Sequence, residues 1–178
     1  IVIGCLLLIA ISMNATSQVI GLAKGLTSSQ DLFNTSMNSN AFCYRIPSLL
    51  KAPNGDLIAA IDERNSSCAD LKGNENINIV IRKSADHGKT WSAIQTIIDF
   101  PFGMSASDPS MILDNQTGMI FLFYNYMDLN KEKDIYYIHV VKSTDNGETW
   151  SKPEDITAQI SKPEWKRDFK FVTSGKGT

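Results

Sequence analysis

The sequence is poor in arginine and histidine and has no excess of positive charge. Its 178 residues carry 17 lysines and arginines against 19 aspartates and glutamates, so the formal net charge is −2 at pH 7. A protein that binds nucleic acid needs a basic surface to contact phosphates, and nucleic acid is therefore not an expected partner. The two histidines, His87 and His139, have no second ligand at a suitable spacing, so we expect neither a metal nor a cofactor.

Cysteines and long apolar runs are also scarce. Three cysteines are too few for a disulfide framework; Cys43 and Cys68 could pair, and buried free thiols explain them equally well. The apolar run at 1–11 is too short to span a bilayer but suits a signal-peptide core. We interpret residues 1–17 as an incomplete signal peptide, which predicts export to the periplasm, cell surface or medium and no membrane span in the mature chain.

An internal repeat is the most informative feature that the sequence does contain. The segment Ser84–Trp91 (SADHGKTW) returns as Ser143–Trp150 (STDNGETW), and each copy is called a box below. In each copy the Asp can accept backbone N–H bonds and the Gly permits a positive φ, so the motif closes a tight hairpin, and its Trp is expected to open the next strand. The two copies begin 59 residues apart. A repeat at this spacing in a strand-rich chain predicts an all-β protein, a β-propeller with four-stranded blades around an axis.

The strand pattern divides the chain into blades. Residues 18–41 are rich in Ser, Asn, Thr and Gly and form a predicted connecting segment. The first blade is predicted at 45–51, 57–64, 77–84 and 91–97, the second at 109–114, 119–127, 135–143 and 150–156, and 169–173 as the innermost strand of a third. Two blades and the start of a third cannot close a ring, so residues 42–178 are expected to be the N-terminal part of a longer propeller.

Candidate functional residues lie where the strands of the first blade begin and end. Arg45 opens the innermost strand, as a surface charge or as a clamp for an anion. Arg64 ends the next strand in Asp62-Glu63-Arg64, where an ion pair with either acid is the alternative role. The long polar loop that follows carries Asp70. At the start of the second blade Asp108 precedes Pro109. It could belong to the functional site or, equally, cap the entry of the strand.

These motifs, taken in order with the repeat, resemble the opening of secreted bacterial exo-sialidases, the six-bladed propellers of glycoside hydrolase family 33. The similarity runs from about Phe42 to Thr178. It implies that Arg45 grips the sialic acid carboxylate with its planar fork, and that Arg64 and Asp108 contact the 4-hydroxyl side of the sugar. It also implies that Asp70 is the general acid/base, which needs a raised pKa that a partly dry pocket could supply.

The implied reaction is hydrolysis of terminal α-linked sialic acids on glycoproteins, glycolipids and oligosaccharides, with retention through a tyrosine nucleophile. That tyrosine, its glutamate partner and two further arginines belong to later blades of the family, so the chain alone is expected to be inactive. Lys176, in Ser174–Gly177, stands where the family often has proline, which is a departure from the pattern.

Two other interpretations stay open. A non-catalytic propeller that binds glycans would use the same repeats without needing an acid at Asp70. The chain could also belong to another protein with such boxes, either a different glycosidase or a scaffold. That interpretation explains the repeats but makes the motif around Arg45 a coincidence. Two further axial arginines with a later Tyr and Glu in the longer protein would favour the sialidase.

Overall fold

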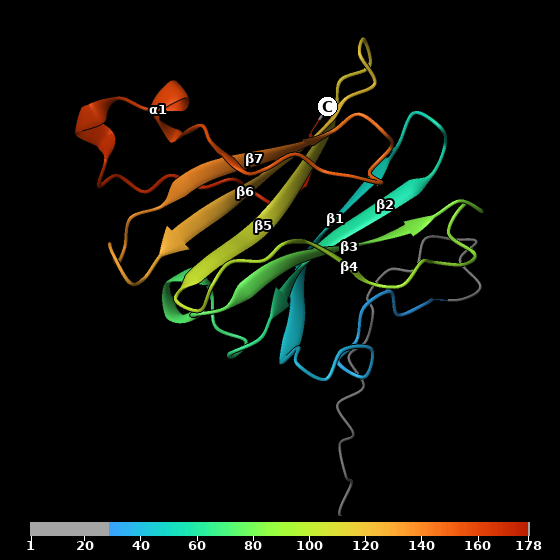
Figure 1. The fold of residues 1–178 in the computed structure, drawn as a ribbon, viewed down its shortest axis with the longest axis horizontal. Coiled ribbons are helices and arrows are strands. Elements are labelled where there is room, and N and C mark those ends of the chain that lie inside the picture. Colours follow the sequence, from blue (N-terminus) through green and yellow to red (C-terminus); the bar gives the residue numbers. More distant parts are fainter. Residues whose placement is uncertain (1–28, 178) are drawn as a thin grey trace, which may run out of the picture. The chain divides into compact units, whose positions relative to one another are not determined.

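The computed structural model describes residues 29–177, so the predicted signal segment at 1–17 and part of the connecting segment lie outside the described residues. The chain from Asp31 onward forms one compact unit. Its first sheet is an antiparallel meander of β1 (Cys43–Lys51), β2 (Leu57–Arg64), β3 (Ile77–Ser84) and β4 (Gln95–Ile98), in that order (Figure 1).

The second sheet repeats this meander. It contains β5 (Met104–Leu113), β6 (Ile120–Asp128), β7 (Tyr137–Ser143) and β8 (Glu154–Asp155), and β9 (Gly175–Lys176) joins it in parallel beside β5. Short helices lie in the connections: η1 (Leu71–Gly73), α1 (Thr157–Ile160) and η2 (Pro163–Trp165). Two four-stranded meanders whose first strands, β1 and β5, lie innermost are propeller blades, which confirms the all-β prediction.

The predicted strands differ from the observed ones mainly at the blade edges. β4 begins at Gln95 and β8 at Glu154, so neither box Trp opens a strand. The reason is the serine after each Trp: the Oγ of Ser92 accepts the N–H of Lys83 at 3.0 Å, where a backbone carbonyl would continue the ladder. The predicted strand at 169–173 is also wrong. There the backbone of Val172 bonds the side chain of Asn125 instead of a neighbouring strand.

Both innermost strands carry the same irregularity. β1 has a bulge between Arg45 and Ser48, and β5 has one between Ser107 and Ser110. Each bulge contains a residue at positive φ directly before a proline: Ile46 at 62° and Asp108 at 61°. Because proline lacks an N–H and restricts the residue before it, it is tolerated at a bulge, where the ladder is already interrupted. β5 therefore begins five residues before the predicted start at Pro109.

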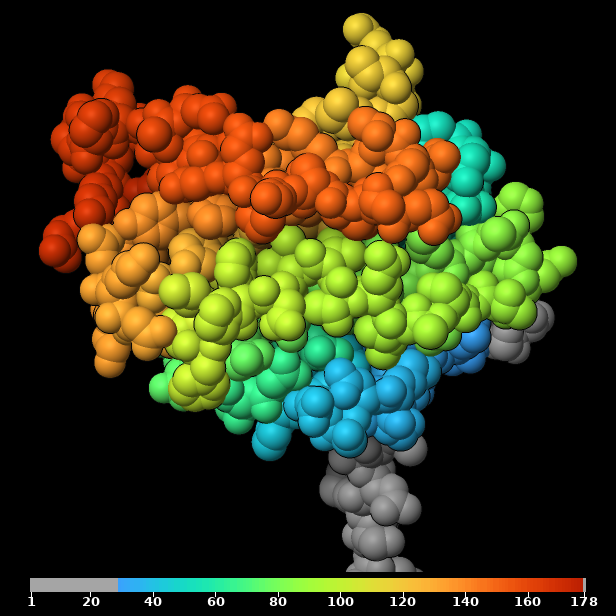
Figure 2. Space-filling view, in the orientation of Figure 1, coloured from blue at the N-terminus to red at the C-terminus, as the bar shows by residue number. Residues whose placement is uncertain are grey.

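The two blades share one hydrophobic core. Ile58, Ile79 and Ile81 of the first blade are completely buried against Leu122 and Tyr124 of the second. In the space-filling view the second box and the segment after it (orange) lie directly on the chain that follows the first box (light green) (Figure 2). This packing between blades removes from water the faces that a single four-stranded sheet would expose.

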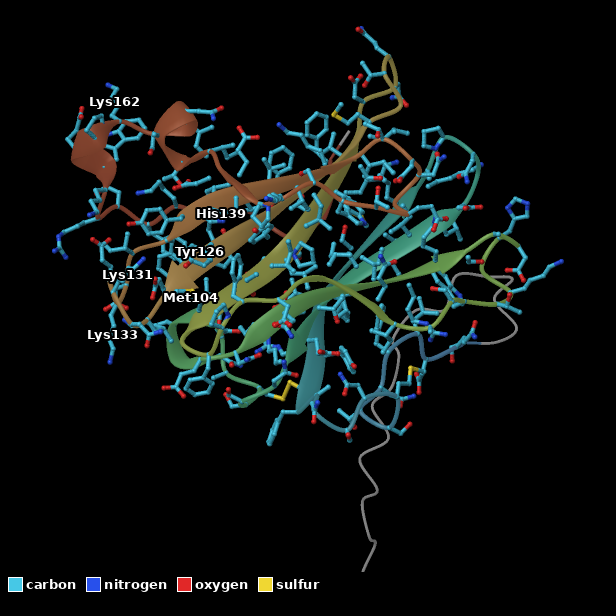
Figure 3. The ribbon with its side chains drawn as sticks, in the orientation of Figure 1. Met104, Tyr126, Lys131, Lys133, His139 and Lys162 are labelled. Atoms are coloured by element: carbon cyan, nitrogen blue, oxygen red, sulfur yellow. A yellow bond between two sulfur atoms is a disulfide. The ribbon has the colours of Figure 1, made fainter. Side chains whose placement is uncertain are left out.

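Aromatic side chains continue this core toward the rim of the second blade. His139 stacks on Tyr126 with ring centroids 4.5 Å apart, and the two residues lie on the same face of β6 and β7 (Figure 3). Phe100, which follows β4 of the first blade, packs on Tyr126 at 4.9 Å. His139 is thus part of this aromatic packing. Among residues 29–177, no helix is long and apolar enough to cross a membrane.

The repeated boxes form closely similar turns. Asp86 accepts the backbone N–H of Thr90 at 2.8 Å and its hydroxyl at 2.6 Å. Asp145 does the same with Thr149, at 2.9 and 2.5 Å. These bonds to the ionised form hold the pKa of both aspartates below the ordinary range. The predicted hairpin role of the boxes is confirmed.

We expect Gly147→Ala to destabilise the protein more than Gly88→Ala, its counterpart in the first box. Both glycines have positive φ, +78° and +87°, so an alanine costs about 1–2 kcal/mol at either position. At 147 the new methyl would also lie 2.6 Å from Cδ1 of the buried Ile58, and this overpacking adds about 1 kcal/mol or more. At 88 the nearest atom, on Leu57, is 3.5 Å away. Urea unfolding followed by tryptophan fluorescence measures both losses, and equal losses would contradict this account.

Candidate active site

A cavity of about 360 Å³ lies where the inner strands of the two blades come together. Three of the sequence-predicted residues line it: Arg45 from β1, Asp70 from the loop after β2, and Asp108 from β5. The fourth, Arg64, is 1 % exposed and reaches Asp70 from below. The structure therefore brings together all four residues that the sequence singled out.

The two arginines converge on one oxygen of Asp70. Nη1 of Arg45 donates to Oδ1 at 3.0 Å, and Nη1 of Arg64 donates to the same oxygen at 2.9 Å. Arg64 also donates to the carbonyls of Cys68 and Ala69, at 3.1 and 2.6 Å. Both arginines thus hold the loop at the mouth of the cavity, where the side chain of Asp70 is 78 % exposed and that of Arg45 is 42 % exposed.

This pairing changes the acidity expected of Asp70. The hydrogen bond from Arg64, together with the charges of both arginines, lowers its pKa below the ordinary value and outweighs the opposing effect of burial. The prediction that the pocket raises the pKa of Asp70 is therefore wrong for the arrangement that the structure shows. A carboxylate in this state accepts hydrogen bonds readily but donates a proton poorly.

A disulfide between Cys43 and Cys68 secures the base of the loop, with their Cα atoms 5.8 Å apart. It decides between the two alternatives that the sequence left open for these cysteines. Cys43 begins β1 two residues before Arg45, and Cys68 lies two residues before Asp70. The bond therefore holds the strand of one site residue against the loop of the other.

Asp62 is a member of the site that the sequence analysis considered only as an ion-pair partner. In the β1–β2 register it lies opposite Arg45, and strand alternation puts Arg64 on the same face. Oδ2 of Asp62 accepts from Nη2 of Arg64 at 2.9 Å, so the ion pair offered as an alternative for Arg64 exists alongside its contact with Asp70. Glu63 faces the other way and accepts from Tyr44 at 2.9 Å.

The buried position of Asp62 controls its charge. Desolvation raises its pKa to about 7, helped by the negative charge of Asp108, and hydrogen bonds from Ser107 and Arg64 only partly oppose this. The alternating pattern Asp62-x-Arg64 at the end of a buried strand was the signal that could have identified this residue, because an unpaired charge is rarely buried completely.

Asp108 sits within β5 at the bulge and does not cap the start of a strand, so that alternative is wrong. Its backbone N–H donates to Oδ1 of Asp62 at 2.9 Å. Its Oδ2 accepts from the amide of Asn125 at 3.2 Å and lies 2.8 Å from the hydroxyl of Ser107. Burial raises the pKa of Asp108 as well. The positive φ at the bulge places this side chain at the cavity.

An aromatic wall that the sequence analysis missed closes one side of the cavity. Phe169 and Phe171 stack with centroids 5.2 Å apart, and Tyr136 meets both rings edge-on at 5.1 and 5.9 Å. The spacing Phe-x-Phe was interpreted as a strand, although it equally places two rings on one side of an extended segment. The cavity thus combines charged groups on one side with apolar rings on the other.

Comparisons with known proteins identify the family of this chain. The family model for the BNR repeat-like domain matches residues 46–178. A sialidase of Bacteroides fragilis is 29 % identical over 79 % of this chain and 28 % of its own length. A sialidase of Micromonospora viridifaciens is 34 % identical over 75 % of this chain and 22 % of its own length. The chain therefore spans about a quarter of the length of these curated relatives.

Solved structures show the same fold. Hadza microbial sialidase Hz136 superposes with a TM-score of 0.69 at 26 % identity, covering 78 % of this chain and 30 % of its own. A sialidase of Streptococcus pneumoniae superposes with a TM-score of 0.70 at 15 % identity, covering 84 % of this chain and 41 % of its own, which shows the fold alone. Because the family model matches well over half of its residues, the chain belongs to the BNR repeat-like domain family, and the relatives that it resembles are sialidases.

Proposed function

We propose that this chain is the N-terminal part of an exo-sialidase that removes terminal α-linked sialic acids from glycoconjugates. The observation that carries the proposal is that Arg45, Asp70 and Asp108 come from three separate segments of the chain to line one cavity, with Arg64 buried beneath Asp70. Arginines bind carboxylates through two parallel N–H bonds, and sialic acid carries a carboxylate next to the bond that is cleaved. The sialidase relatives support the same substrate class.

In this proposal Arg45 receives the substrate carboxylate. Its guanidinium is partly exposed at the cavity, and within residues 29–177 its partners are Asp70 and the carbonyl of Cys68, so an incoming carboxylate can compete for it. Arg64 is 1 % exposed and held from below by Asp62, so in this proposal it supports Asp70 from beneath the cavity without contacting the sugar directly, and Asp108 is the acceptor at the cavity. The rings of Phe169 and Phe171 offer an apolar surface to the uncharged part of the sugar.

Substrate binding itself would prepare Asp70 for acid catalysis. When the sialic acid carboxylate takes Arg45, Asp70 loses one of its two cations and gains a negative neighbour. Both changes raise the pKa of Asp70, and a carboxyl group that has taken up a proton can donate it to the departing glycosidic oxygen. In this proposal the lowered pKa of Asp70 comes from its contacts with both arginines, and the incoming carboxylate reverses it.

The remaining parts of the machinery are proposed to lie in later blades of the longer protein. Retention would follow from a tyrosine nucleophile with a glutamate partner, and two more arginines would complete the carboxylate clamp. The chain alone would then be inactive. We further propose that residues 1–17 belong to an export signal, so that the enzyme meets glycans in the periplasm, on the cell surface or in the medium.

A second candidate function is glycan binding without catalysis. The observation that favours it is the lowered pKa of Asp70, because a carboxylate held by two arginines is a poor proton donor. A binding module would keep Arg45, Arg64 and the aromatic wall but gain nothing from a proton on Asp70. The two functions therefore differ in what happens when that carboxyl group is removed.

In the longer protein that contains this chain, we expect Asp70→Ala to lower kcat on a sialylated lactose about 100-fold, the usual scale for a general acid/base. With an aryl sialoside the fall should be smaller, since that leaving group needs less protonation. Asp99→Ala, at an exposed aspartate after β4, is the control and should leave kcat unchanged. A folded native protein that binds the sialoside but releases no sialic acid would establish the binding module instead.

We expect Arg45→Lys to raise KM for the same sialoside about 10-fold or more while changing kcat less. Lysine keeps the positive charge but replaces a two-pronged donor with a single point, and a charge-assisted hydrogen bond contributes about 1.5–3 kcal/mol. Arg167→Lys, at an exposed arginine, is the matched control. An unchanged KM in Arg45→Lys would show that Arg45 does not hold the carboxylate.

A further inference from the structure

The hydroxyl of Ser107 lies between two carboxyl groups. Its Oγ is 2.6 Å from Oδ2 of Asp62 and 2.8 Å from Oδ2 of Asp108. A hydroxyl has one proton, so it can donate to only one of these oxygens. If both aspartates were ionised, the other contact would bring two oxygen lone pairs together at hydrogen-bond distance with no proton between them. Both contacts are favourable only when one carboxyl group carries a proton of its own.

The other partners of these carboxyl groups do not supply that proton. Nη2 of Arg64 and the backbone N–H of Asp108 donate to Asp62, and the amide of Asn125 donates to Asp108. Each of these groups bonds a carboxylate oxygen directly. None of them lies between Ser107 and a carboxylate. The contact with Ser107 therefore has to be completed by the aspartates themselves.

A count of charges around the site leads to the same conclusion. The charged groups around the two carboxyls are the guanidiniums of Arg64 and Arg45, the carboxyl of Asp70, and the ion pair of Lys72 with Asp134, whose lysine lines the same cavity. With every group ionised, three positive charges stand against the four negative charges of Asp62, Asp70, Asp108 and Asp134. One bound proton makes the cluster neutral. Neutrality matters here because Asp62 is completely buried and burial of a net charge is costly.

We propose that Asp62 and Asp108 share one proton through Ser107 near neutral pH, and that Asp62 is a positioning residue that controls the charge of Asp108 at the cavity. Through this chain of contacts, a residue of the first blade decides whether a residue of the second presents a neutral or a charged carboxyl group to the ligand. Burial raises the pKa of both groups, that of Asp62 to about 7, and the two titrate as a coupled pair.

The consequence for ligand binding rests on the proposed sialidase function. A sialic acid is an anion, and it would enter beside Asp70 and Asp108. While the pair keeps its proton the cluster is neutral, and the anion meets no net repulsion. When the proton leaves, the cluster becomes negative and the anion is bound less well. KM should therefore rise as the pH passes through 7, by about 10-fold between pH 6 and 8 for one required proton.

The same proton should make the free energy of unfolding depend on pH, in a direction that can be stated. An unfolded aspartate loses its proton near pH 4, whereas in the folded protein the pair of Asp62 and Asp108, in which the pKa of Asp62 is about 7, keeps one proton until then. Between these values the folded state binds more protons than the unfolded state. The contribution of Asp62 to stability is therefore largest below pH 4 and declines as the pH rises through 7.

The decisive measurement uses the whole protein and needs no activity. Asp side-chain carboxyls labelled with ¹³C are titrated by NMR from pH 3 to 9, and the two resonances are assigned from Asp62→Asn and Asp108→Asn. We expect the pair to release its last proton near pH 7, and each substitution to shift the titration of the other group. Complete ionisation of both carboxyls below pH 5 in the native protein would overturn the proposal.

The functional consequence is tested by the pH dependence of KM. Asp62→Asn removes one of the two carboxyls, so we expect the rise between pH 6 and 8 to disappear. Glu63→Gln is the matched control: Glu63 is buried on the same strand but faces Tyr44 and Asn38, so this variant should keep the rise. A rise that persists in Asp62→Asn would overturn the positioning role. A protein without sialidase activity would refute the proposed function, while the NMR titration would still decide whether the proton is shared.

Discussion

The buried ion pair between Asp62 and Arg64 is the interaction on which the rest of the site depends. Both side chains are almost completely removed from water, and their charged atoms lie 2.9 Å apart. Burying either charge alone would be very unfavourable, and removing one partner of such a pair typically costs about 3–5 kcal/mol. The pair is retained because each member has further partners, so that few of its hydrogen-bonding groups are left unsatisfied.

Those further partners connect three parts of the molecule. Asp62 accepts bonds from the backbone of Asp108 and the hydroxyl of Ser107, both in the second blade. Arg64 donates to the carbonyls before Asp70 and to Asp70 itself, in the loop of the first blade. One ion pair therefore positions the candidate acid, the mouth of the cavity and the neighbouring blade. At the bulge of the second blade's inner strand, the N–H of Asp108 is directed at Asp62.

Local sequence patterns predicted most of the fold. β2 and β3 have the predicted boundaries, because each contains an apolar run and is bounded by strong turn residues. The boxes were identified as hairpins because Asp and Gly at fixed positions restrict the backbone locally. The patterns failed where the ladder is replaced by side-chain bonds, as at Ser92 beside β3 and at Asn125 beside Val172. Hydrophobic alternation cannot report whether an extended segment finds a strand partner or an amide side chain.

The sequence by itself determined the two blades and the residue types of the site, because turn chemistry, strand alternation and the order of the motifs act over short distances along the chain. Only the tertiary structure decided how these residues interact. It closed the disulfide between Cys43 and Cys68, placed Asp70 between two arginines, and brought Ser107 between Asp62 and Asp108, two acids from different blades. The protonation of a carboxyl group depends on burial and on the charges within a few ångströms, and these are set by the packing of one blade on the next.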